Sequence, residues 1–290
     1  MKHFKQILSV AVVLACVLYG AAQWYFSAPE PQVDLDVHYI DVGQGDSILV
    51  VCNGEAMLID GGDNDAEDIL PDYLRRQGVT KLDYIVATHP HADHCGGLDA
   101  AARSVDLGTV YTSCLDYDTK SFRDFIGTVE QKGGTLTFPE PDSGFDLGGA
   151  TVTVLGPRTY NVPETWNNAS IVLRLVYGDT SFLFTGDMEQ EEETELLEAG
   201  CDVSCDVLKV GHHGSRTSSG YRLLYEAAPT AAVISCGTDN DYGHPHKQAL
   251  ERLNDAGVSY IFRTDLQGSI VFHSDGTDLT YTTEYNNDWN

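Results

Sequence analysis

From residue 35 onward, short apolar or alternating runs recur along the chain and predict β-strands. Residues 35–40 alternate polar and apolar side chains, and the runs 47–51 and 57–59 lie on either side of the turn-forming pair Asn53-Gly54. These three segments predict an antiparallel meander. Further apolar runs predict strands at 82–87, 151–155, 171–176, 181–184, 207–210, 231–234, 260–262, 269–272 and 279–282.

Segments with helical spacing separate several of these strands. The predicted helices span 67–77, 121–132, 189–199, 219–227 and 247–256, and four of them stop at Gly78, Gly133, Gly200 or Gly257. Strands and helices therefore alternate, without internal repeats or low-complexity tracts. The pattern alone predicts one mixed α/β domain.

Residues 1–33 have a different pattern and are predicted to lie outside the domain, which then spans 34–290. Residues 7–26 form an almost uninterrupted apolar run that is long enough to cross a bilayer as a helix, and Lys2 and Lys5 precede it. The basic flank predicts that the domain faces outside the cytoplasmic membrane. Small residues near the end of the run also allow a cleaved signal peptide, which would leave the domain secreted.

Acidic side chains outnumber basic ones in the whole chain, 44 to 17. Only Lys2, Lys5 and Glu30 fall in 1–33, so the domain has 15 basic and 43 acidic side chains and a formal charge of −28. This balance excludes a broad basic surface that neutralises nucleic-acid phosphates. A polyanionic substrate would have to be held locally, by metal ions and a few cationic side chains.

The cysteines leave the redox state open. Cys16 belongs to the apolar run, and the others are Cys52, Cys95, Cys114, Cys201, Cys205 and Cys236. A location outside the cell permits disulfides, but a domain of this size can be stable on its core alone. Buried free thiols are therefore the favoured interpretation.

The densest group of candidate ligands is the segment HPHADH at residues 89–94, directly after the predicted strand 82–87. Three imidazoles and one carboxylate within six residues are the ligand mixture that suits Zn²⁺, Mn²⁺ or Fe²⁺. Gly96-Gly97 predicts the turn into a helix. A surface loop rich in histidine is the alternative, but this spacing between a strand and a Gly-Gly pair favours a metal-binding loop.

At these residues the chain resembles the metallo-β-lactamase superfamily, which is characterised by a His-x-His-x-Asp-His loop after a buried strand. Other elements of that pattern appear in the expected order at 58–62, 184–187 and 210–215. Segments similar to the extracellular hydrolase domain of ComEC-type competence proteins lie at 40–47, 167–173 and 243–245. The resemblance covers residues 35–283 and implies an αββα sandwich, in which two facing mixed sheets carry helices on their outer sides.

The resemblance also implies a centre with two divalent transition metals, Zn or Mn. Its implied ligands are His89, His91, Asp93, His94, Asp187 and His212. Asp187 would bridge the two ions, although it could equally cap the helix that follows it. Of the neighbouring His212 and His213, we expect His212 to bind metal and His213 to orient it or to contact substrate.

One element of the superfamily pattern is missing. The third histidine of the first metal normally precedes the strand predicted at 171–176, yet the chain has no histidine between His94 and His212. Asn168 lies in that neighbourhood, either as a ligand or substrate contact or as a turn-forming residue. The first metal is therefore expected to bind more weakly than the second.

Other polar residues are candidates for catalysis or substrate binding. Two divalent ions lower the pKa of a shared water, which Asp93 is placed to orient. His244 could donate a proton to the leaving oxygen or bind the scissile phosphate, although a structural role beside Pro245 is equally compatible. Ser215 and Arg216 offer contacts to phosphoryl oxygens.

Three aspartates in other loops are given structural roles. Asp60 is expected to accept a hydrogen bond from a metal-binding histidine. Asp41 and Asp46 are expected to fix a turn and a loop rather than to bind metal.

The predicted function is metal-dependent hydrolysis of a phosphodiester, with DNA outside the cell as one candidate substrate. The alternatives are another ester, a thioester or a lactam, and a non-enzymatic binding module with a degenerate metal site. The N-terminal segment would supply the contact with the membrane. No protein partner can be inferred from the sequence.

Overall fold

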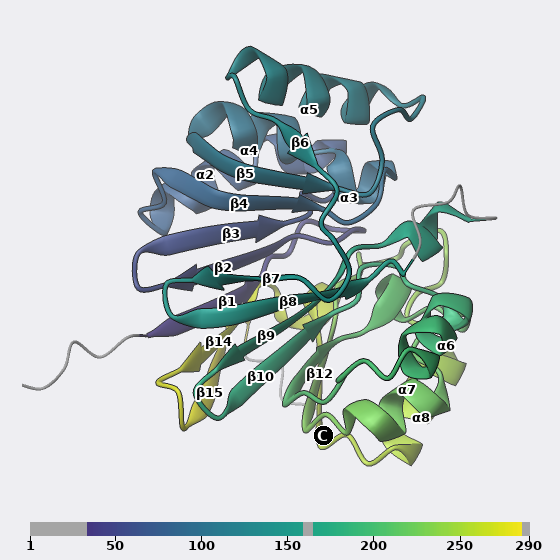
Figure 1. Ribbon diagram of the computed structural model, residues 1–290. Helices are drawn as coiled ribbons and strands as arrows, with labels where there is room; N and C mark the ends of the chain where they lie inside the picture. The colour runs from purple at the N-terminus through teal and green to yellow at the C-terminus, as the bar shows by residue number, and fades with distance from the viewer. Residues whose placement is uncertain (1–33, 159–164, 286–290) are drawn as a thin grey trace, which may run out of the picture. The chain divides into compact units, whose positions relative to one another are not determined.

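The computed structural model describes residues 34–158 and 165–285 (Figure 1). Contacts join these described residues into one compact unit. The predicted apolar segment at 7–26 lies outside the described residues. Within the described ranges, no helix is long and apolar enough to cross a membrane.

Among the described residues, eight strands form the first sheet in the order β15-β14-β1-β2-β3-β4-β5-β6. β1, β2 and β3 pair antiparallel, so the predicted meander is confirmed, whereas β3 to β6 run parallel. The strands are β1 (Leu35–Tyr39), β2 (Ile48–Cys52), β3 (Glu55–Ile59), β4 (Lys81–Ala87), β5 (Asp106–Thr112), β6 (Leu136–Thr137), β14 (Ile270–Ser274) and β15 (Leu279–Thr283).

The second sheet contains seven strands of the described part of the chain, in the order β13-β12-β11-β10-β9-β8-β7. β10 to β13 run parallel and β7 to β10 antiparallel, so this sheet is mixed as well. The strands are β7 (Gly144–Leu147), β8 (Ala150–Gly156), β9 (Val172–Tyr177), β10 (Thr180–Phe184), β11 (Val207–Lys209), β12 (Ala231–Ile234) and β13 (Tyr260–Arg263).

Helices cover the outer face of each sheet (Figure 1). On the first sheet, buried side chains of α2 (Leu70–Arg76), α4 (Leu98–Ser104) and α5 (Lys120–Gln131) pack with those of β3 and β4. On the second sheet, α6 (Gln190–Glu198), α7 (Tyr221–Ala227) and α8 (Lys247–Asp255) pack on β10 to β12. The short helical segments are η1 (Asn64–Glu67), α3 (Ala92–Cys95), η2 (Trp166–Ala169), η3 (Gly211–Gly214) and α9 (Thr264–Gln267).

Aromatic side chains join the inner faces of the two sheets. The ring of Tyr39 in β1 lies 6.4 Å from that of Phe184 in β10, and Phe182 in β10 lies 6.4 Å from Phe272 in β14. All four side chains are buried. The predicted αββα sandwich is therefore confirmed, because each sheet packs against the other on one face and against helices on the opposite face.

Three strands, β5, β6 and β7, and one helix division were not predicted from the sequence. β6 contains only two residues. β5 and β7 lack a continuous apolar run, since both alternate buried residues with exposed or half-buried ones. The helix predicted at 67–77 is divided into η1 and α2, and Pro71 occupies the first turn of α2, where its missing N–H costs nothing.

Candidate metal centre

The loop after β4 is held in place by Asp60, which directly follows β3. The Asp60 carboxylate accepts hydrogen bonds from the backbone N–H of Thr88 at 2.8 Å and from its hydroxyl at 2.7 Å. Its Oδ2 also lies 2.7 Å from Nδ1 of His94. This contact leaves Nε2 of His94 free to face the centre, which is the orienting role expected of Asp60.

Close backbone contacts explain the glycines of this loop. A Cβ on Gly96 would lie 2.2 Å from the carbonyl carbon of Asp63, and one on Gly97 would lie 2.5 Å from the carbonyl oxygen of Gly61. Both glycines have negative φ angles. The Gly-Gly pair is therefore required for space, and the turn into α4 follows without any left-handed residue.

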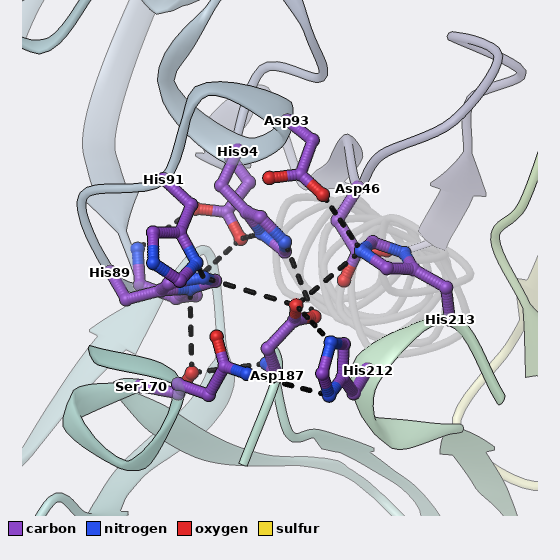
Figure 2. A network of polar contacts seen from close by, with 12 residues as sticks. Asp46, His89, His91, Asp93, His94, Ser170, Asp187, His212 and His213 are labelled. Atoms are coloured by element: carbon purple, nitrogen blue, oxygen red, sulfur yellow. Dashed lines mark hydrogen bonds and ion pairs between the residues drawn. The ribbon is translucent and has the colours of Figure 1, made fainter. Parts of the chain in front are cut away.

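Four imidazoles converge on the carboxylate of Asp187, which follows β10 (Figure 2). Nε2 of His94 lies 3.2 Å from Oδ1 of Asp187, and Nε2 of His213 lies 3.4 Å from Oδ2. Nε2 of His212 and Nε2 of His89 lie farther from Oδ2, at 3.7 Å and 3.9 Å. Asp187 is thus central to the site, as expected for a bridging carboxylate.

His213 is oriented by a second buried carboxylate. Its Nδ1 lies 3.3 Å from Oδ1 of Asp46 and 3.1 Å from the carbonyl oxygen of Ser235, while its Nε2 lies 3.3 Å from Asp93. The other oxygen of Asp46 pairs with the fully buried ammonium of Lys209 at 2.7 Å. The Asp46 carboxylate therefore stabilises both the orientation of His213 and the charge of Lys209.

His89 and His91 form the other side of the centre. Nε2 of His89 and Nδ1 of His91 are 3.0 Å apart, so these two nitrogens face the same point. Nδ1 of His89 lies 3.1 Å from the Thr88 hydroxyl and 3.4 Å from the Ser170 hydroxyl. Neutral hydroxyls, rather than a carboxylate, orient this histidine.

The donor set fits a divalent cation. One ligand atom from each of Asp46, His94, Asp187 and His213 can be chosen so that all four lie within 4.8 Å of one another. Nε2 of His94, Nε2 of His213 and Oδ1 of Asp187 are buried and make no hydrogen bond, although they lie close together. A cation among these atoms would bind buried groups that otherwise make no hydrogen bond.

The electrostatics of the centre support the same interpretation. Burial disfavours the charged form of His94 and His213, but the surrounding carboxylates, above all Asp187, outweigh it and raise the pKa of both imidazoles well above the ordinary value. The carboxylates thus attract positive charge to these two nitrogens. A divalent cation provides that charge when it replaces the protons.

The structure differs from the sequence-based expectation for the two adjacent histidines. His213, expected to orient its neighbour or contact substrate, is the buried imidazole between Asp93 and Asp187. His212, expected to be the ligand, is 23% exposed, and its Nδ1 lies 3.2 Å from Glu189. Both residues have left-handed backbone angles, with φ near 50°, so their imidazoles leave η3 in directions that spacing alone does not indicate.

Three other expectations are also changed by the geometry. Asn168 lies in η2, the turn before β9, which agrees with its expected turn-forming role, and its side chain accepts a hydrogen bond from the backbone N–H of Glu189 just before α6. Asn167, not Asn168, lines the cavity, with Nδ2 3.4 Å from Nδ1 of His212. Asp46, expected to fix a loop, contacts His213 and Lys209 through its carboxylate and lies beside the candidate ligands. Ser215 is buried and its hydroxyl lies 3.0 Å from that of Thr217, outside the cavity lining.

A cavity of about 360 Å³ opens onto the centre. It is lined by Gln44, Asp63, His91, Ala92, Asp93, Tyr117, Thr119, Asn167, Asp187, His212, His213, Tyr242 and His244. Larger cavities of about 530 and 520 Å³ lie beside β5–β6 and β13, but no histidine lines either of them. Candidate metal ligands therefore line the smaller cavity, whose size is within the usual range for small-molecule sites, roughly 300–1,000 Å³.

Both predicted catalytic residues, Asp93 and His244, line this cavity, and His244 comes from the loop after β12. Its ring lies 5.5 Å from that of His212 and 6.0 Å from that of His213. Burial, with the neighbouring imidazoles, lowers the pKa of His244 to about 4. A neutral His244 is suited to hydrogen bonding with a substrate oxygen rather than to storing a proton at neutral pH.

Comparisons with known proteins agree with this geometry. Residues 40–238 match the family described as Metallo-beta-lactamase superfamily. The chain is 28% identical to ComE operon protein 3 of Bacillus subtilis over 93% of its length and 32% identical to Competence protein ComA of Neisseria gonorrhoeae over 83%. It is also 32% identical to Recombination protein 2 of Haemophilus influenzae over 79%. The resemblance to ComEC-type competence proteins is thereby confirmed.

These relatives are much longer than the present chain. The chain spans 36%, 33% and 27% of their respective lengths. Among solved structures, it is similar to the metallo-beta-lactamase fold protein YhfI from Bacillus subtilis, with a TM-score of 0.56, 13% identity and coverage of 83% of this chain and 100% of that one. At such low identity this similarity supports the fold alone.

Proposed function

The chain belongs to the metallo-β-lactamase superfamily, and we propose that it is a phosphodiesterase that holds two divalent metals around Asp187. The observation that carries the proposal is the convergence of imidazoles and carboxylates from both sheets on this one buried side chain. Such a centre is built for hydrolysis, and the cavity beside it gives a substrate access.

Each group in the centre has a role in this proposal. His89 and His91 would hold one cation, and Asp93, His94 and His213 the other, with Asp187 between them. Two such cations supply an activated water and neutralise charge on the entering and leaving oxygens.

Asp93 and His244 act on water and substrate. Burial opposes ionisation of Asp93, but its contacts with His213 and His94 outweigh burial and hold the pKa of the carboxyl below its ordinary value. An ionised Asp93 accepts a hydrogen bond and orients the attacking water. His244, neutral and without a hydrogen-bond partner for its buried Nδ1, can bind a phosphoryl oxygen.

Two features support a phosphodiester over a lactam. His212 and His244 face the cavity beside the ligand cluster and offer imidazole contacts suited to phosphoryl oxygens. The competence and recombination proteins named above are the relatives, which supports nucleic acid as the substrate class. Another ester, a thioester, a lactam or a degenerate binding site are the alternatives that the experiment must separate.

The proposal is tested by side-by-side turnover of bis-p-nitrophenyl phosphate, a single-stranded DNA oligonucleotide and a chromogenic β-lactam. We expect hydrolysis of the two phosphodiesters with Zn²⁺ or Mn²⁺, loss of hydrolysis on chelation, and two metals per chain by elemental analysis. Asp187→Ala should lose both metals and most activity, whereas Asp65→Ala, which removes an exposed carboxylate in η1, should keep both. Lactam opening with both phosphodiesters left intact would refute the proposal.

We further propose that the domain is displayed outside the cytoplasmic membrane. The support is the sequence alone, namely the apolar run 7–26 behind Lys2 and Lys5. Protease added to intact protoplasts should digest the domain while a cytoplasmic marker survives. Protection until lysis would show the opposite orientation.

A further inference from the structure

The cavity beside the metal centre has one strongly exposed aromatic side chain in its lining, Tyr242. This residue is 64% exposed, whereas Tyr117, the other aromatic residue in the lining, is partly buried. The ring of Tyr117 packs against those of Trp166 and Phe122, at 5.5 Å and 6.3 Å. Tyr117 therefore forms part of the wall, and Tyr242 is the aromatic surface available to a ligand.

Tyr242 is placed directly beside the residues that surround the reaction site. Its ring is nearly parallel to that of His244, with an interplanar angle of 17° and centroids 5.6 Å apart. His244 in turn lies 6.0 Å from His213, which faces Asp187. A planar group on Tyr242 would thus be one imidazole away from the metal-facing histidine.

The loop that presents Tyr242 is fixed by hydrogen bonds. The side chain of Asn240 donates to the carbonyl oxygens of Gly237 and His244 and accepts from the backbone N–H of His244, at 2.8, 2.7 and 2.9 Å. The side-chain oxygen of Gln44, which itself lines the cavity, accepts from Gly237 at 3.2 Å. A preorganised ring loses little conformational freedom when a ligand stacks on it.

The charge of the domain makes such a surface necessary for a nucleic-acid substrate. At −28, the domain cannot hold a strand through many phosphate contacts. Base–aromatic stacking is independent of charge and tolerates any base, since every base has a π-face. An exposed tyrosine at the cavity is therefore a means of holding a strand without a basic groove.

We infer that Tyr242 is a stacking platform for a nucleobase next to the scissile phosphate, which makes a nucleic-acid strand the substrate class of this centre. The inference rests on the proposed phosphodiesterase function. Tyr242 is a specificity residue here, because it acts on the part of the substrate that does not react. A quaternary ammonium group on the same ring is the competing ligand.

Matched substrates test this inference. One is a thymidine dinucleotide, and two others carry an abasic sugar on the 5′ or the 3′ side of the same phosphodiester. For the unaltered protein, we expect kcat/KM to fall roughly 5- to 150-fold when the stacked base is missing. Tyr242→Ala should abolish this preference with metal content unchanged, and Tyr242→Trp should retain it.

Tyr225→Ala is the control, because Tyr225 is 63% exposed in α7 and does not line the cavity. Equal cleavage of the base-containing and abasic substrates by the unaltered protein would overturn the inference and leave the proposed function standing. The inference would also be overturned, with the proposed function left standing, if Tyr242→Ala lowered the hydrolysis of p-nitrophenyl phosphorylcholine only. Failure to cleave any phosphodiester would instead refute the proposed function, and the inference with it.

Discussion

The two sheets build the metal centre in different ways. Of the proposed metal ligands, those from the first sheet lie in one continuous loop, residues 89–94, directly after β4. The second sheet contributes Asp187 after β10, His212 and His213 after β11, and His244 after β12. Parallel strands that end at the same edge bring these separate segments together. The first half of the centre depends on local spacing, and the second depends on the tertiary fold.

The two histidines nearest to Asp187 show the same difference. His94 is oriented by Asp60, whose other partners are the neutral N–H and hydroxyl of Thr88. His213 is oriented by Asp46, whose other partner is the buried cation Lys209. The hydrogen bonds between Asp60 and Thr88 involve neutral groups of Thr88 and can be lost one at a time. Loss of either Asp46 or Lys209, in contrast, leaves the other as a buried charge without its partner.

The largest effect is expected from the adjacent histidines. His213→Ala should lower the metal content from two ions to one per chain and remove most hydrolysis, because its Nε2 lies within 3.4 Å of both Asp93 and Asp187. His212→Ala should keep two ions and lower the rate less, since His212 is half-buried and farther from Asp187. Elemental analysis and bis-p-nitrophenyl phosphate turnover measure both. If His212→Ala instead lost more metal and more activity than His213→Ala, His212 would be the ligand.

Substitution of the orienting carboxylates Asp46 and Asp60 should affect metal binding less than His213→Ala does, but it should also lower the stability of the protein. Asp46→Asn and Asp60→Asn should each weaken metal binding by roughly 10- to 100-fold. Asp46→Asn should also lower the free energy of unfolding by about 3 kcal/mol, because Lys209 then remains buried and unpaired. Asp60→Asn should cost about 1 kcal/mol, since His94 keeps Asp187 as a partner and the other bonds of Asp60 are to neutral groups of Thr88.

A double variant separates the two roles of Asp46. Asp46→Asn with Lys209→Met should regain the stability, measured by urea unfolding of the metal-free protein, but not the metal affinity. The contrast between the halves of the centre would be wrong if Asp46→Asn and Asp60→Asn destabilised the protein equally.

Of the adjacent asparagines, Asn168 should affect the stability of the protein and Asn167 its catalytic rate. Asn168→Ala should lower the free energy of unfolding by about 1 kcal/mol with unchanged kinetics, because it removes the acceptor for the N–H of Glu189 at the start of α6. Asn167→Ala should lower kcat/KM with little change in stability, since its side chain lines the cavity. Chemical unfolding and phosphodiester turnover distinguish the two. A kinetic effect in Asn168→Ala alone would support the sequence-based expectation instead.

The contrast between the sheets also explains what could be predicted from the sequence. The loop 89–94 and Asp187 were identified because their motifs are contiguous and follow buried strands. Spacing did not distinguish His212 from His213, because both residues have left-handed backbone angles that the sequence motif does not indicate. Asp46 was missed as a partner of His213 because the two come from different sheets, 167 residues apart in the chain.

The strand predictions follow the same logic. Apolar runs identified most strands, and β12, which was predicted at its observed bounds, is buried on both faces. β5 was missed because only Val110 and Thr112 of its residues are buried. Its position beside β4 comes from parallel pairing, which has no local sequence signal.

The smallest expected effect concerns a buried carboxylate outside the centre. Glu192 in α6 is 4% exposed and accepts a hydrogen bond from the backbone N–H of Arg158, without a cation like the one that stabilises Asp46. Burial, with the nearby charge of Glu195, raises the pKa of Glu192 to about 7 from an ordinary value of 4.5. The folded state therefore binds this proton more tightly than the unfolded state.

This raised pKa sets the sign of a pH effect on stability. Protonated Glu192 contributes to the free energy of unfolding. This contribution is complete below about pH 4.5 and is lost as the pH rises through about 7. Glu192→Gln, which keeps the neutral form, should match the unaltered protein near pH 5 and exceed its free energy of unfolding by on the order of 2 kcal/mol near pH 8. Urea unfolding at several pH values measures the difference, with the exposed Glu198→Gln as control. A constant difference across this range would show that Glu192 titrates at its ordinary pKa, and the contrast with the cation-paired Asp46 would then disappear.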